Sequence, residues 1–124
     1  MIDMKYDIIG KTLKTQAFKI DFGEDIKNVI VHNNIFIVLL NPINNKGGIR
    51  HDVKNNVYGV SSVGEVIWQI QNPGALYPNL PWGADDTFVG IACRANGILT
   101  AVTFGYVYAL DCKTGKVEYL DMHW

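Results

Sequence analysis

The residue types best suited to chemistry are scattered along this chain. The histidines His32, His51 and His123 lie far apart, and none stands at a metal-ligand spacing from a cysteine or a carboxylate. Cys93 and Cys112 are isolated and form no CxxC pair. No serine or cysteine lies in a nucleophile-elbow motif. We therefore expect no metal, no cofactor and no catalytic residue, and we predict that the protein is not an enzyme.

Two acidic pairs are candidates for acid–base chemistry or for a contact surface. Glu24-Asp25 and Asp85-Asp86 each precede a predicted strand. Paired carboxylates act as acid and base only where the site encloses them, and nothing in the sequence indicates such enclosure. Solvated loop ends are the simpler interpretation, and a surface that faces a basic partner is the alternative.

The segment NPGALYPNLPWGADD, residues 72–86, is the most unusual in the chain. It contains three of the four prolines and carries Tyr77 and Trp82. Tyrosine and tryptophan on a proline-stiffened loop lose little entropy on binding, and they are frequent in interface hot spots. Two interpretations stay open: Leu80 and Trp82 close the open end of the sandwich, or the segment forms a surface that binds a protein partner. The predicted partner-binding set combines the acidic pairs, these two aromatic residues and one histidine: Glu24, Asp25, His51, Tyr77, Trp82, Asp85, Asp86.

Composition predicts one globular domain. The chain has 124 residues, of which 48% are apolar and 19% charged, and its net charge is −1. Such a charge gives no electrostatic case for nucleic-acid binding. The apolar run Ile35–Leu40 is too short for a membrane helix, which needs about 20 residues, and no signal peptide is recognisable at the N-terminus. We expect a cytoplasmic protein with reduced thiols, Cys93 as a small buried residue and Cys112 at a turn edge.

Alternation of apolar and polar residues with period two dominates the chain, and Gly and Asn separate the alternating stretches. No window shows a helical period. The predicted strands are residues 5–9, 13–22, 27–32, 35–40, 56–61, 65–71, 87–94, 98–103, 105–111 and 116–122.

An internal repeat organises these strands. KNVIVHNNIFIVLL (residues 27–40) aligns with GIACRANGILTAVT (residues 90–103), and NVYGVSSVGEVIWQI (56–70) aligns with YVYALDCKTGKVEYL (106–120). Asn33-Asn34 then falls on Asn96-Gly97, and Trp68 falls on Tyr119 after a one-residue gap. The first copy has roughly thirteen extra residues between its second and third strands, and their Pro, Gly and Asn content is typical of an exposed loop.

Each copy predicts a four-stranded antiparallel meander, the form of one propeller blade. The predicted fold is all-β, with an N-terminal hairpin (1–26), a first blade-like repeat (27–71), a connecting loop (72–86) and a second blade-like repeat (87–124), packed as a half-propeller or a β-sandwich. Asn96-Gly97 predicts a two-residue hairpin turn with positive φ. In DCKTGK we expect a type I turn with Gly115 in the left-handed region, held by the Asp111 side chain.

The stretch ALDCKTGKVEY, residues 109–119, resembles the blade signature of the quinoprotein (PQQ-repeat) β-propellers, Ala-x-Asp-x-x-Thr-Gly-Lys-x-x-Trp. Residues 59–68, GVSSVGEVIW, are a degraded copy that keeps Gly64 and Trp68. The resemblance implies that the terminal aromatic residue packs against the neighbouring blade and that the glycine lies in the turn. A closed propeller needs about 4–8 blades, so two copies cannot enclose the channel in which a quinone would bind.

The favoured hypothesis for function is a non-catalytic protein-binding module. Among such proteins, bacterial immunity proteins that neutralise a cognate toxin, as in contact-dependent growth inhibition, are small single domains without motifs of their own, so the analogy is one of class. The acidic pairs would face a basic toxin surface while the two aromatic residues fill a pocket.

Two other functions stay open. One is a small-ligand-binding protein or enzyme whose site forms only in three dimensions, from His51, Asp52, Tyr77 and Asp85. The other is a structural module that forms a homodimer through open sheet edges.

Overall fold

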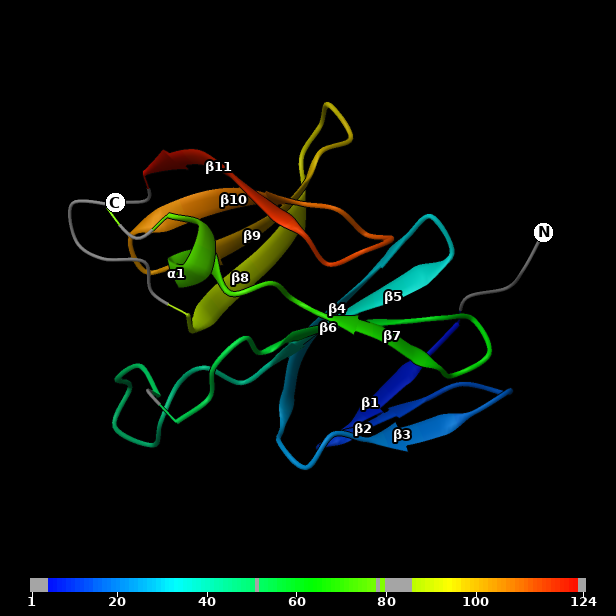
Figure 1. The fold of residues 1–124 in the computed structure, drawn as a ribbon. Helices are drawn as coiled ribbons and strands as arrows, with labels where there is room; N and C mark the ends of the chain where they lie inside the picture. The colour runs from blue at the N-terminus through cyan, green and yellow to red at the C-terminus, as the bar shows by residue number, and fades with distance from the viewer. Residues whose placement is uncertain (1–4, 51, 78, 80–85, 123–124) are drawn as a thin grey trace.

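The computed structural model describes residues 5–50, 52–77, 79 and 86–122, which form three antiparallel sheets and one short helix (Figure 1). The N-terminal sheet contains β1 (Asp7–Ile9), β2 (Thr12–Lys14) and β3 (Lys19–Asp21). The central sheet contains β4 (Ile26–His32), β5 (Ile35–Leu40), β6 (Val57–Val60) and β7 (Val66–Gln69). The C-terminal sheet contains β8 (Phe88–Cys93), β9 (Leu99–Thr103), β10 (Tyr106–Leu110) and β11 (Val117–Met122). Helix α1 (Pro73–Leu76) lies between β7 and β8.

The all-β prediction with two four-stranded meanders is confirmed, because the strands of both larger sheets pair in chain order. The N-terminal hairpin is wrong in one respect. Residues 13–22, expected as one strand, form β2 and β3, so the N-terminal sheet has three strands. Thr15 makes the turn: its backbone N–H donates to the carbonyl of Phe18 at 2.8 Å, and its Oγ1 accepts the N–H groups of Ala17 and Phe18 at 3.1 Å.

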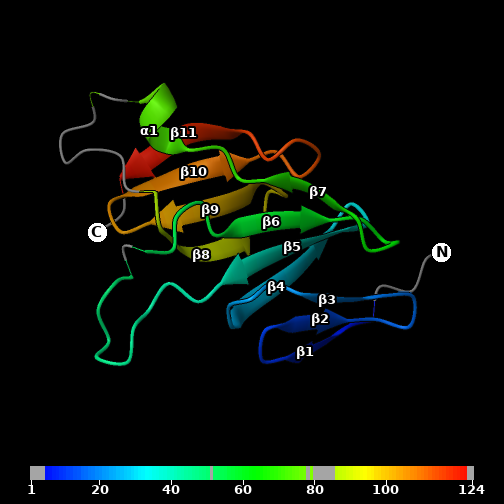
Figure 2. The same cartoon turned by 60° about the horizontal axis from the view of Figure 1, so that its bottom comes forward.

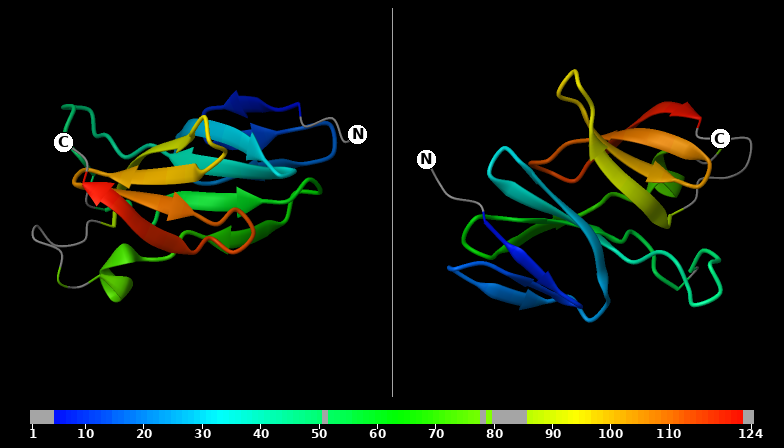
Figure 3. Two further views of the ribbon diagram at one scale, coloured as in Figure 1. Left: turned by 90° about the horizontal axis from the view of Figure 1, so that it is seen from above. Right: turned by 180° about the vertical axis from the view of Figure 1, so that it is seen from behind.

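The sheets stack face to face and do not close into a barrel (Figures 1 and 2). The central sheet is buried on both faces, which explains the unbroken apolar run of β5. Ile37 and Leu39 point into the core shared with the C-terminal sheet, and Phe36 and Val38 into the core shared with the N-terminal sheet. The views in Figure 3 show the outer sheets on opposite sides of the central one.

The outward faces of the two end sheets carry different side chains. On the N-terminal sheet the register places Asp7, Lys14 and Lys19 in one row, on the face opposite to buried Leu13. On the C-terminal sheet two rows run from β8 to β11 on the face away from the central sheet, and both consist of small or β-branched residues followed by a carboxylate: Ala92, Thr100, Ala109, Glu118; and Gly90, Val102, Val107, Asp121. Thr100 and Val107 are nevertheless buried.

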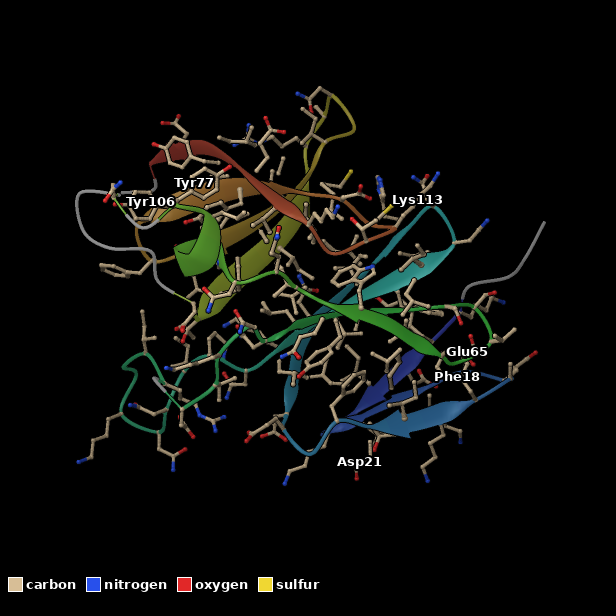
Figure 4. The ribbon with its side chains drawn as sticks, viewed as in Figure 1. Phe18, Asp21, Glu65, Tyr77, Tyr106 and Lys113 are labelled. Carbon is tan, nitrogen blue, oxygen red and sulfur yellow. The ribbon has the colours of Figure 1, made fainter. Side chains whose placement is uncertain are left out.

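An aromatic ring on a glycine joins each sheet to the next. Trp68 packs against Gly59 and against the turn residue Gly115, where a Cβ atom would lie 2.7 Å from the ring atom Cε3. The Trp68 Nε1 group donates to the carbonyl of Cys112 at 2.7 Å. Phe18 covers Gly64, in the β6–β7 turn, in the same way (Figure 4 labels Phe18 beside Glu65). These contacts fix the spacing between neighbouring sheets.

The alignment of Trp68 with Tyr119 does not hold in three dimensions. A β-bulge at Ile67 places Trp68 opposite Gly59, so that the indole faces the C-terminal sheet. In β11 the bulge comes later, and Tyr119 lies opposite Tyr108, facing back toward the central sheet. A shift of one residue turns a side chain to the other face, so the structural counterpart of Trp68 is Glu118.

Of the two turn predictions, one is wrong and the other is confirmed. Asn33 and Asn34, with φ of 50° and 63°, form the two-residue turn between His32 and Ile35. Asn96-Gly97 does not, because the hairpin closes from Arg94 to Ile98 and only Gly97 of the two has a positive φ, 86°. The DCKTGK prediction is confirmed: Asp111 Oδ1 accepts the N–H of Lys113 at 2.8 Å, and Gly115 has a φ of 75°.

We expect Gly59→Ala to destabilise the protein by about 1–3 kcal/mol, because the new methyl group meets a ring held in place by its hydrogen bond. Urea unfolding measures the effect. Gly90→Ala is the matched control, since no atom of the described residues lies within 4 Å of the added Cβ, and it should change stability by roughly 0.5 kcal/mol or less. In a Trp68→Leu background the cost of Gly59→Ala should disappear, and an unchanged cost would contradict the contact.

Candidate partner-binding surface

Three segments far apart in sequence meet at one end of the stack (Figure 2). They are the β3–β4 turn, the inserted loop of residues 41–55 and the residues just before β8. The N–H of Asn41 donates to the carbonyl of Asp25 at 2.8 Å, and the N–H of Asn55 donates to the carbonyl of Asp86 at 2.6 Å. The Thr87 hydroxyl donates to the carbonyl of Arg50 at 3.2 Å. The structure therefore brings the predicted residues Glu24, Asp25 and Asp86 to a single loop.

The inserted loop has an internal structure of its own. Ile43 and Ile49 form an antiparallel bridge, and the side chain of Asn44 closes the turn between them. Its Oδ1 accepts the N–H of Lys46 at 2.9 Å and the N–H of Gly48 at 3.0 Å. An asparagine that bonds the backbone two residues on is a standard turn former, so the tip of the loop is ordered locally.

Asn56 fixes the end of the inserted loop to both larger sheets. Its side chain is buried, and its Nδ2 group donates to the carbonyls of Leu40 at 2.9 Å and Phe88 at 2.8 Å. Its Oδ1 accepts the N–H of Phe88 at 2.7 Å. Because a buried amide with three partners is held in one orientation, the loop leaves the sheets at a fixed angle.

Arg50 ties the inserted loop to the β3–β4 turn. Its guanidinium donates to both carboxylate oxygens of Glu24, at 2.8 and 3.2 Å, and to both oxygens of Asp52, at 3.0 and 3.3 Å. The hydrogen bond from Arg50 lowers the pKa of Glu24 below its usual range, and the two carboxylates raise the pKa of Arg50. The Arg50 side chain is 19% exposed and that of Asp52 is 72% exposed, so Asp52 presents its charge to solvent.

The other predicted site residues have different surroundings. The Asp25 side chain is exposed, and the carboxylate of Asp86 lies 3.7 Å from the Lys54 ammonium. Tyr77 is partly buried and packs on Tyr108 and Tyr119 at the edge of the core, and its assignment to a partner surface stays a prediction. His51, Trp82 and Asp85 lie outside the described residues.

Sequence reasoning named Asp52 only for the alternative ligand site and missed Arg50 altogether. The available signal was weak: Arg50 is one of only two arginines in the chain and stands in a Gly- and Asn-rich loop beside an aspartate. Arginine is the residue best shaped for bidentate contact with carboxylates, but its partner Glu24 is 26 residues away in sequence.

The burial predicted for the two cysteines is wrong, because each has the exposure expected of the other. Cys112 is buried in the core under Trp68, and Cys93, the last residue of β8, is exposed. The Cys93 sulfur lies 3.9 Å from Nδ1 of His32, and two ligands do not complete a tetrahedral metal site. Within residues 5–50, 52–77, 79 and 86–122, no three His, Cys, Asp or Glu side chains gather in a way that could hold a metal ion.

Comparison with known proteins gives one match. A family model described as "Domain of unknown function (DUF7957)" matches residues 1–122. No curated protein and no solved structure matches the chain. In the part of the chain that the structure describes, no helix has the length and apolar character needed to cross a membrane. The resemblance to PQQ-repeat blades stays a prediction.

We expect Glu24→Gln to loosen the inserted loop at neutral pH, raising amide exchange of residues 41–50 on the order of two- to five-fold, as for other exposed ion pairs. The pKa of Glu24 is lowered in the folded protein, so its contribution is present above the ordinary glutamate pKa of 4.5 and is lost as the pH falls through the lower folded value. Wild type and variant should therefore become alike near the acid end of that range. Hydrogen exchange of wild type and variant, measured at neutral pH and at the acid end of that range, tests this prediction, with Glu65→Gln as control. A difference in exchange rate that is equal at the two pH values would contradict it.

Proposed function

The chain belongs to the family described as a domain of unknown function (DUF7957), and we propose from its own geometry that it is a non-catalytic protein-binding module. The binding surface is the loop end of the stack, formed by the β3–β4 turn, the inserted loop and the residues before β8. The single observation that carries this proposal is the order of the inserted loop, which four separate contacts hold in one conformation.

A loop that is already ordered loses less conformational entropy on binding, and this saving appears as affinity. The inserted loop interrupts the repeat and adds no strand to either sheet. Yet Asn44, Arg50, Asn55 and Asn56 each bond it to itself or to a neighbouring element. A loop that extends no sheet and is still held by several hydrogen bonds favours a role in recognition.

The charges at the loop end favour a basic partner. Among the described residues of the three segments, the carboxylates of Glu24, Asp25, Asp52 and Asp86 outnumber the cations of Lys46, Arg50 and Lys54, although Lys11 of the adjacent β1–β2 turn also acts on Glu24. Asp25 is exposed, and Asp52 is exposed although Arg50 binds it together with Glu24. Exposed carboxylates of this kind steer a basic protein into place and raise its association rate.

The partner class that we favour is a bacterial toxin domain, which would make this chain an immunity protein of the kind found in contact-dependent growth inhibition. A small domain that acts by occupying a toxin surface needs an ordered loop and complementary charge, and it needs no reactive group. The Asn-, Ile- and Lys-rich composition suits an AT-rich bacterial genome. A toxin gene beside the gene for this chain would identify the partner to be tested.

With that toxin domain as ligand, Asp25→Lys should slow association at least about ten-fold at low salt, because steering by charge acts on the association rate. Stopped-flow or surface plasmon resonance measures the rate. Asp7→Lys is the matched control, since it makes the same charge change on the outward row of the N-terminal sheet. Equal slowing by both variants would place the binding surface elsewhere.

Trp82→Ala tests whether the connecting segment, residues 72–86, also contacts the partner. If Trp82 anchors the partner, the substitution should weaken binding by about 2 kcal/mol or more, while thermal stability stays at the wild-type value. Calorimetric titration and thermal unfolding of the same preparation separate the two effects. A loss of stability with unchanged affinity would assign Trp82 to the core.

A further inference from the structure

The outer edge of β11 is the feature that neither the repeat nor the proposed function explains. β11 is the last strand of the C-terminal sheet, and among the strands that the structure describes it pairs only with β10. An edge strand presents a row of N–H and C=O groups on which another chain can add a strand. In β11 the N–H groups of Val117 and Tyr119 point away from β10, as alternate residues of an edge strand do.

Two side chains from one segment accept hydrogen bonds from these outward N–H groups. Oε1 of Gln71 accepts the N–H of Val117 at 3.2 Å, and the hydroxyl oxygen of Tyr77 accepts the N–H of Tyr119 at 3.0 Å. The backbone N–H of Gln71 also donates to the carbonyl of Gly115, at 2.9 Å, just before β11 begins. Residues 71–77, here called the edge strap, therefore follow the edge of β11, and Figures 2 and 4 show α1 and Tyr77 beside that strand.

The short helix α1 positions Tyr77 beside the edge of β11. Oδ1 of Asn72 accepts the N–H of Gly74 at 2.8 Å and caps the helix, and the N–H of Tyr77 donates to the carbonyl of Pro73 at 2.9 Å. The Tyr77 ring centroid lies 6.0 Å from that of Tyr119. Ring packing positions the hydroxyl, so the ring and the hydroxyl have separable roles.

We propose that the edge strap is an autoinhibitory contact that prevents β11 from pairing with β11 of a second copy of this chain. The two acceptor atoms stand where the carbonyl groups of an added antiparallel strand would lie. A second copy brings an identical edge, and two-fold pairing of identical edges is the simplest closed assembly.

The charges of β11 fit pairing with a second copy. Lys116 stands immediately before the strand, and Asp121 lies near its other end. Antiparallel pairing about a two-fold axis places the Lys116 end of one strand against the Asp121 end of the other, so opposite charges meet at both ends. Glu118, between them on the same face, comes beside its own copy near the axis, so one like-charge contact stands against two attractive ones.

The test is the double variant Gln71→Leu/Tyr77→Phe, which removes both acceptors and keeps the tyrosine ring packing. Multi-angle light scattering should give the monomer mass of 13.9 kDa for wild type and a concentration-dependent rise toward twice that mass for the variant. Hydrogen exchange at Val117 and Tyr119 should be faster than in wild type in dilute variant and slow again as it associates. Tyr58→Phe, which deletes a tyrosine hydroxyl in the central sheet, is the control and should remain a monomer.

A charge test locates the contact. Adding Lys116→Glu to the double variant should abolish association, and adding Asp121→Lys as well should restore it. A double variant that stays monomeric at every concentration overturns the proposal, as does a wild type that is already dimeric through β11. Association that Lys116→Glu leaves unchanged places the interface elsewhere and overturns it equally.

Discussion

The indole of Trp68 is the contact on which the stack depends. It crosses from the central sheet to the C-terminal sheet, lies against two glycines and gives its only N–H to the Cys112 carbonyl. Sheets that do not close into a ring must bury their apolar faces on one another, and generic apolar packing leaves their spacing and angle loosely defined. An aromatic ring that fits only over a glycine defines both. Phe18 on Gly64 repeats the arrangement between the other two sheets, so one device is used twice.

The strand order could be predicted from the sequence because local signals determine it. Alternation with period two, separated by Gly and Asn, placed both meanders almost to the residue. The errors arose where a single side chain or a single residue decides the geometry. The Thr15 hydroxyl folds one expected strand into two. The bulge at Ile67 rotates Trp68 to the face opposite to that of Tyr119, although the two residues stand at the same distance from their turns in sequence.

The candidate surface was harder to predict than the fold because its contacts are long-range. The acidic pair at Glu24 and the Pro-rich segment stood out by composition alone. No local pattern shows that Arg50 pairs with Glu24, or that the Tyr77 hydroxyl reaches the N–H of Tyr119 42 residues later. Both contacts depend on which loops the stacking of the sheets brings together. The repeat and the turn signals carry no information about either contact, because each joins segments that the sequence gives no reason to pair.

The same register difference explains why the stack ends where it does. In the central sheet the residue opposite Gly59 is Trp68, which engages the next sheet. In the C-terminal sheet the residue opposite Ala109, the counterpart of Gly59, is Glu118. A carboxylate in place of an indole offers nothing to bury and costs free energy to desolvate, so the face ends the stack. The edge of that sheet is a separate matter. A charge on the face does not prevent a further strand from pairing with β11, because strand addition proceeds through backbone hydrogen bonds. That is the physical reason for closing it with acceptors from residues 71–77.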